Sequence, residues 1–140
     1  MPTRRTRRRR TWKLRIERRR FRGTWRWTVD NPKGWVYRGR DTIEWTLVLD
    51  RHTRGKRISA HFQFAHEDLV EAFKKPSDLT RDLTAVIKAP GGKLELKVRK
   101  DACPRENPRY YAVWIQDETL RHGGVYAIGK NPPPEMQVGP

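Results

Sequence analysis

The 140-residue chain has a single cysteine, Cys103, and no long apolar segment. One thiol excludes an internal disulfide, which fits a reducing compartment. The basic N-terminus is not followed by the apolar stretch of a secretory signal, and no segment approaches the roughly 20 apolar residues of a membrane-spanning helix. We therefore expect a cytoplasmic protein that does not interact with a membrane.

Catalytic motifs are also missing. The sequence has two serines and contains no nucleophile elbow, P-loop, dinucleotide-binding glycine motif or HExxH zinc motif. Two adjacent acidic pairs do not indicate acid–base catalysis. Neighbouring side chains on a strand point to opposite faces, which separates Asp117 from Glu118, and Glu67 and Asp68 more simply lie at the N-terminus of a helical stretch. We predict that the chain is not an enzyme and that it needs no cofactor or metal.

Acidic residues are scarce at the N-terminus, where the positive charge is concentrated. The first 26 residues carry 13 Lys and Arg and one acid, Glu17, which is +12 of the total charge of +16. The other 114 residues carry 19 basic and 15 acidic side chains, a net charge of +4. Charge this dense repels itself and is relieved by a polyanion. We predict a basic arm, residues 1–10, that leads into a basic hairpin, residues 11–30.

Nucleic acid, either RNA or DNA, is the polyanion that this pattern favours. Arginine stays charged and binds phosphate in a bidentate manner, and each neutralised phosphate releases counterions. A solubilising tail and a localisation signal are the alternative interpretations of the arm. The predicted phosphate contacts are Arg4, Arg5, Arg7, Arg8, Arg9, Arg10, Arg15, Arg18, Arg19, Arg20, Arg22 and Arg26.

Alternation of apolar and polar residues with a period of two indicates nine or ten short β-strands separated by turn signals. The predicted strands cover 12–17, 25–29, 35–37, 43–49, 58–64, 83–88, 94–98, 110–116 and 122–128, with a further edge strand over 135–138. This pattern predicts an all-β sandwich with a first connection over 18–23, a central strand covered on both faces over 110–116, and one short helix over 67–75. We assign residues 11–140 to one domain that ends in a Pro-rich tail, 131–140.

Tryptophans and arginines interleave in the N-terminal part of the chain. Tryptophan at alternating strand positions is typical of a buried core, and this interpretation is favoured here. Indole rings beside cations also stack nucleic-acid bases, and an arginine stacked on an exposed tryptophan is a purely structural third option. The tryptophans concerned are Trp12, Trp25, Trp27 and Trp35, interleaved with Arg15, Arg22 and Arg26.

Four segments of the sequence follow one another in a characteristic order. The pieces that carry it are 36–45 (VYRGRDTIEW), 58–64 (ISAHFQF), 110–115 (YYAVWI) and 131–138 (NPPPEMQV). Their order resembles that of small bacterial cupredoxin-like β-sandwich domains, which implies a cupredoxin- or immunoglobulin-like sandwich and carries no activity with it. Arg40 splits the Gly-Asp turn of those domains, and Asn131 replaces their Asp. Their copper-binding members place Cys, His and Met close together in sequence, whereas Cys103, His122 and Met136 are far apart.

Three functions remain open from the sequence. The leading prediction is a non-enzymatic nucleic-acid-binding or nucleic-acid-associated structural protein whose arm and hairpin contact the phosphate backbone. The alternative is a protein–protein interaction module of a larger assembly, in which a sheet edge or residues 132–134 bind the partner and the arm binds an acidic surface. A copper electron-transfer protein is the third and least favoured.

Overall fold

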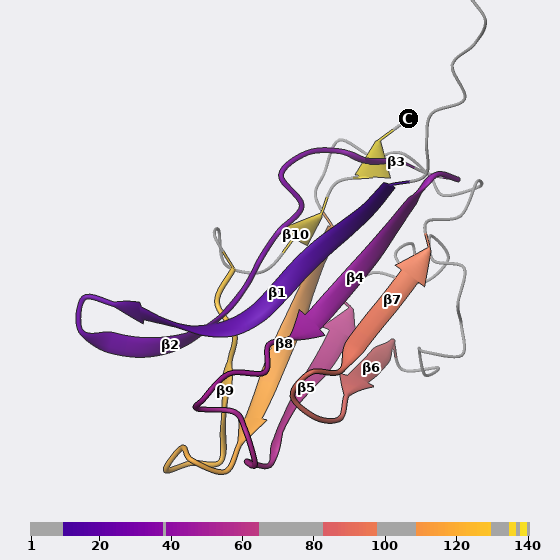
Figure 1. Cartoon of the computed structure of the whole chain (residues 1–140). Coiled ribbons are helices and arrows are strands. Elements are labelled where there is room, and N and C mark those ends of the chain that lie inside the picture. Colours follow the sequence, from indigo (N-terminus) through magenta and orange to yellow (C-terminus); the bar gives the residue numbers. More distant parts are fainter. Residues whose placement is uncertain are drawn as a thin grey trace, which may run out of the picture.

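The computed structural model describes residues 10–37, 39–64, 83–97, 109–129, 135–136 and 138–139. These residues form eleven β-strands and no helix, so nothing among them is a helix able to cross a membrane. The strands build two sheets that pack together as a β-sandwich, as the alternation predicted (Figure 1). The helix predicted over 67–75 and residues 1–9 of the arm lie outside the described residues.

The first sheet has the strand order β2 (Thr24–Val29), β1 (Arg10–Phe21), β4 (Asp41–Leu47) and β7 (Lys93–Lys97). The inner pair, β1 and β4, runs parallel, whereas the two outer pairs are antiparallel. Parallel neighbours need a connection that crosses over, and here β2 and the short strand β3 (Val36–Tyr37) lie within it. The N-terminal strand therefore lies between β2 and β4, with its first half, up to Ile16, paired to β4 and its second half paired to β2.

The second sheet has the order β6 (Thr84–Ile87), β5 (Ile58–Phe64) and β8 (Arg109–Asp117). Two short strands, β9 (Gly124–Tyr126) and β10 (Glu135–Met136), both pair with β8, at opposite ends of it. All of these pairs are antiparallel. A separate parallel pair joins β3 to β11 (Val138–Gly139).

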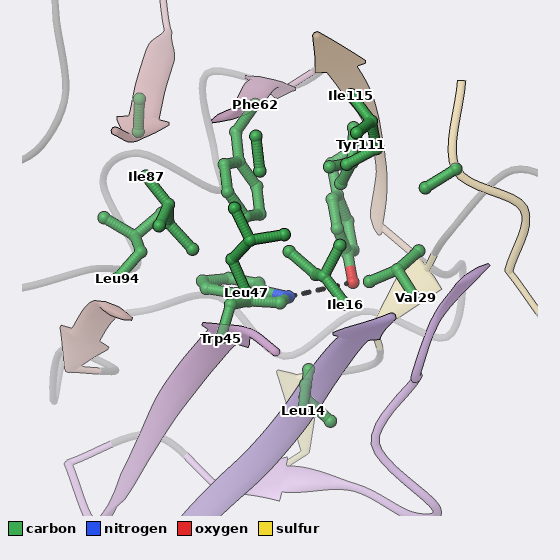
Figure 2. Close-up of a cluster of buried hydrophobic side chains, with 14 of the residues drawn as sticks. Leu14, Ile16, Val29, Trp45, Leu47, Phe62, Ile87, Leu94, Tyr111 and Ile115 are labelled. Carbon is green, nitrogen blue, oxygen red and sulfur yellow. Dashed lines mark hydrogen bonds between the residues drawn. The ribbon is translucent and has the colours of Figure 1, made fainter. Parts of the chain in front are cut away.

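Aromatic side chains fill the space between the sheets. Trp45 of β4 is fully buried, with its ring centroid 5.2 Å from that of Phe62 and 5.6 Å from that of Tyr111. Its indole Nε1–H donates a hydrogen bond of 3.2 Å to the Tyr111 hydroxyl, which is the dashed line in Figure 2. Burial raises the pKa of Tyr111, so the hydroxyl stays protonated. A polar group that would be costly to bury is thus satisfied inside the core.

Strand β8 corrects one part of the sequence prediction. It is a central strand, as expected, but its outer face is not fully covered, because Trp114 is 36% exposed and Tyr110 is also exposed. Trp114 packs edge-to-face on Tyr126 of β9, with centroids 4.8 Å apart. Its ring also lies over Gly124, where an added Cβ would come within 2.4 Å of it. Trp114 and Tyr126 therefore pack on each other along the outer surface of the sheet.

The first connection is shorter than predicted. Residues 18–21 belong to β1, and the turn consists of Arg22 and Gly23 alone. Both have positive φ, 49° and 79°, as a two-residue hairpin turn of type I′ requires. The arginines assigned to a loop therefore lie on a strand, where they alternate between its two faces.

Candidate nucleic-acid interface

The β1–β2 hairpin extends beyond the sandwich. β1 pairs with β4 only as far as Ile16, and from Glu17 to Phe21 it pairs with β2 alone. In Figure 1 this part of the hairpin reaches to the left, past the ends of β4 and β7. We call residues 18–26 the hairpin tip. Every tip residue except the half-buried Arg18 is exposed, so both faces of this ribbon are open to solvent.

Positive charge dominates the tip. It holds five arginines and no acidic residue. Glu17, just before it, pairs with Arg15 at 3.0 Å and with Arg19 at 2.7 Å, and Asp30 lies 3.3 Å from Arg19. Within the described part of the chain, the other four tip arginines form no ion pair; they are Arg18, Arg20, Arg22 and Arg26. The hairpin is therefore electrically balanced near the sandwich and unbalanced at its end.

The strand register places these charges on two faces. Arg20 lies opposite Trp25, and Arg18 opposite Trp27, on the face that continues the core. On the other face Arg19 lies directly opposite Arg26, and the carboxylates of Glu17 and Asp30, which pair with Arg19, offset part of the repulsion between these two cations.

An exposed aromatic ring occupies each face of the tip. The Arg18 guanidinium lies 4.9 Å from the ring centroid of Trp25. On the opposite face, Arg22 and Arg26 lie 5.4 Å and 5.3 Å from the ring of Phe21. Both rings therefore sit within a group of cations.

Two buried carboxylates anchor the hairpin to the body, and the first, Asp41, lies where β1 begins. Its side chain accepts hydrogen bonds from Arg10 at 2.9 Å, Arg40 at 2.7 Å, the Trp12 indole at 3.0 Å and the Tyr37 backbone at 2.8 Å. Burial by itself would raise the pKa of Asp41, but these donors outweigh it and hold that pKa below its ordinary value. Arg10 also stacks on Trp12, 3.9 Å from its ring centroid. The point at which the arm joins the sandwich is thus held by a charged cluster.

The second carboxylate, Asp117 of β8, holds the base of β2. The buried Trp27 indole donates a 3.0 Å hydrogen bond to it across the two sheets, and Thr119 donates from its backbone N and its hydroxyl, at 2.9 Å and 2.7 Å. Burial opposes ionisation, yet these donors lower the pKa of Asp117. Beside this anchor, Ile128 hydrogen-bonds to the edge of β2 at Trp27 and Val29. The hairpin therefore leaves the sandwich from a rigid base.

The predicted arginines divide into three groups. Arg4, Arg5, Arg7, Arg8 and Arg9 lie outside the described residues, so nothing is assigned to them. Arg10, Arg15 and Arg19 are bound to carboxylates of this chain. Arg18, Arg20, Arg22 and Arg26 lie together at the tip, and no carboxylate of the described residues pairs with them.

The core interpretation of the tryptophans is confirmed for Trp27, which is 3% exposed, and not for Trp25, which is 55% exposed. Trp12 is partly buried, and Trp35 is exposed. Sequence reasoning missed Phe21, whose position within an arginine run on an alternating strand was the available signal. It also missed the anchoring roles of Asp41 and Asp117, because the residues that they anchor, Arg10, Trp12 and Trp27, are distant in sequence.

Comparison with family models, curated proteins and solved structures gives no match to this chain. The β-sandwich therefore rests on the strand pairing described above, and the cupredoxin resemblance stays a sequence-based prediction. Among the described residues, no three His, Cys, Asp or Glu side chains gather closely enough to hold a metal ion. Cys103 lies outside that part of the chain.

Proposed function

We propose that this chain is a non-enzymatic, cytoplasmic protein that binds the phosphate backbone of nucleic acid through its hairpin tip and N-terminal arm. The observation that carries the proposal is the group of four tip arginines that no carboxylate of the described chain neutralises. They lie on a ribbon that projects from the sandwich, where a long polyanion can approach from either face.

Phosphate is the ligand that suits these side chains. A guanidinium group presents a planar set of N–H donors that matches two phosphate oxygens and keeps its charge at any physiological pH. Arg19 is already paired with Glu17 and Asp30, so of the two opposed cations Arg26 is the one that a phosphate would neutralise. Glu17 and Asp30 limit the cationic surface to the end of the hairpin, since they neutralise the arginine side chains nearest the sandwich.

A salt titration tests the proposal. The full chain is mixed with a labelled 20-nucleotide oligonucleotide, and the dissociation constant is measured by fluorescence anisotropy from 50 to 300 mM KCl. Neutralising several phosphates gives a log–log slope of about −0.7 for each contact on a single strand and about −0.9 on a duplex. We expect a slope equivalent to at least four contacts. Absence of binding at 50 mM salt would overturn the proposal.

The contribution of the arm is measured by deleting residues 1–9. The deletion stops before Arg10, because removing that residue would break its ion pair with Asp41 and disturb the start of β1. We expect the truncated protein to keep its unfolding midpoint and to bind with a shallower slope. The difference between the two slopes counts the phosphate contacts that the arm makes.

A protein–protein interaction module is the second candidate. It is favoured by exposed apolar side chains on the outer face of the second sheet, where Val86, Trp114 and Tyr126 lie along one row of strand pairs. In this case the arm and tip would bind an acidic protein surface. Polyglutamate distinguishes the two functions, because an acid-binding protein would bind it as tightly as an oligonucleotide of equal charge. We expect the oligonucleotide to be favoured at 150 mM salt.

A further inference from the structure

The hairpin tip exposes two large aromatic side chains that the fold does not need there. Trp25 and Phe21 are 55% and 52% exposed, and they lie on opposite faces of the ribbon. Two residues further along the same face as Trp25, Trp27 is buried and bonded to Asp117. The sandwich therefore ends between these two tryptophans. Neither ring belongs to the core, so each leaves an apolar face that a ligand with an apolar face of its own can cover.

Each exposed ring lies beside arginine side chains, one at Trp25 and two at Phe21. The guanidinium of Arg18 lies 4.9 Å from the Trp25 ring centroid, and those of Arg22 and Arg26 lie just over 5 Å from that of Phe21. A partner protein with an apolar surface would have to desolvate these charges, which is costly. A ligand that carries an aromatic face and an adjacent negative charge matches both features together.

We propose that the hairpin tip binds unpaired nucleotides of a single-stranded nucleic acid. One base stacks on Trp25 and a second on Phe21, while the neighbouring guanidinium groups contact the phosphates between them. This inference rests on the proposed function and narrows it to a substrate class. Stacking on aromatic rings combined with a cationic path for the backbone is the general mode by which proteins bind single strands.

A double-stranded nucleic acid offers no free base face on which Trp25 and Phe21 could stack. Base faces inside a double helix are covered by neighbouring base pairs, and the grooves present only base edges. A two-stranded ribbon does fit the major groove of B-form DNA, and in that mode the arginines would act while the rings would be dispensable. The contribution of the two rings therefore distinguishes the two modes of binding.

The test compares Trp25→Leu with Trp25→Phe in the full chain. A 12-nucleotide single strand and the blunt duplex of the same sequence are titrated at 100 mM salt. We expect Trp25→Leu to weaken single-strand binding by about 5- to 150-fold, the range for loss of one stacked base, and to leave duplex binding within about twofold. Trp25→Phe keeps a π-face and should retain most of the affinity. Trp35→Leu, which removes an exposed tryptophan outside the hairpin, is the matched control and should change neither.

A second measurement leaves the protein unaltered. An abasic 12-nucleotide strand carries the same phosphates as the normal strand but offers no base to stack. The wild-type protein should bind it more weakly than the normal strand, and Trp25→Leu, which keeps Phe21, should discriminate less between the two strands. Equal loss of single-strand and duplex affinity in Trp25→Leu, or equal binding of normal and abasic strands by the wild type, would overturn the stacking inference while phosphate binding stands. Failure of the wild type to bind any strand would instead overturn the proposed function.

Discussion

Neutralising the unpaired tip arginines should change the salt dependence of binding by a calculable amount. The tip variant is R18Q/R20Q/R22Q/R26Q, which keeps side chains of similar length and removes four charges. These four side chains form no ion pair within the described residues, so the substitutions leave the carboxylate contacts of Glu17, Asp30 and Asp41 in place. We therefore expect the sandwich to keep its stability.

The magnitude follows from the number of unpaired cations. Each phosphate contact on a single strand contributes about 0.7 to the log–log salt slope, so four contacts contribute about 3. Between 50 and 200 mM salt this corresponds to about a 50-fold greater loss of affinity in the wild type than in the tip variant. At 50 mM salt the tip variant should bind more weakly than the wild type, and the two affinities should converge as the salt concentration rises.

A control variant that loses the same number of charges separates the effect of the tip arginines from the effect of total net charge. The loop variant, R51Q/R54Q/K56Q/R57Q, removes four cations from the connection between β4 and β5, where the four side chains are exposed. It lowers the net charge by the same amount but carries no predicted phosphate contact. Anisotropy titrations of all three proteins at six salt concentrations give the slopes, and urea unfolding verifies that each is folded.

Two results would refute the reasoning. If the tip variant keeps the wild-type slope, the four arginines do not neutralise phosphates. If the loop variant lowers the slope as much as the tip variant does, binding depends on overall charge, and the local arrangement at the hairpin has no special role.

Three further predictions concern the anchors of the hairpin and the outer face of the second sheet. The folded-state pKa values of Asp41 and Asp117 lie below the unfolded value of about 3.9, so their contribution to stability is present above that pH and is lost as pH falls through the folded pKa. The urea midpoint should therefore fall between pH 7 and pH 2, and it should fall less steeply in Asp41→Asn. An equally steep fall in that variant would contradict this prediction. Trp27→Phe removes the indole donor to Asp117 and part of a buried ring, so the free energy of unfolding in urea should drop by about 2–4 kcal/mol. A drop below about 0.5 kcal/mol would show that the hydrogen bond between Trp27 and Asp117 contributes little to stability. Gly124→Ala would place a methyl group against the Trp114 ring, so about 1–3 kcal/mol of stability should be lost in the same assay, and unchanged stability would mean that the ring moves aside freely.

The positions of many strands could be predicted from the alternation of apolar and polar residues alone. The predicted strand over 58–64 coincides with β5, and those over 83–88 and 110–116 differ from β6 and β8 by about one residue at each end. Alternation is a local property, because each side chain on a strand points to the face opposite its neighbours. Local turn chemistry was less well interpreted at 18–23, since the arginines before the Arg22–Gly23 turn continue the strand instead of ending it.

Strand pairing and side-chain burial could not be predicted from the sequence in the same way. The parallel contact of β1 with β4 joins Arg10 to Asp41, residues that are 31 positions apart, and Trp27 meets Asp117 across 90 positions. Nothing in the neighbouring sequence distinguishes Trp25 from Trp27, since both occupy alternate positions on one strand. Their difference arises because one lies over the opposite sheet and the other lies beyond it.

The sequence by itself determined that the described part of the chain is built of β-strands and that the positive charge is concentrated at one end, because side-chain alternation and charge are properties of each residue and its neighbours in sequence. Only the tertiary structure decided which of those charges are available. The parallel β1–β4 pairing ends at Ile16 and sets where the hairpin leaves the sandwich, and the carboxylates of Glu17, Asp30 and Asp41 neutralise the arginines on the near side of that point. Ion pairing and burial depend on which distant segments meet in space, which is why the tip could be identified only from the folded chain.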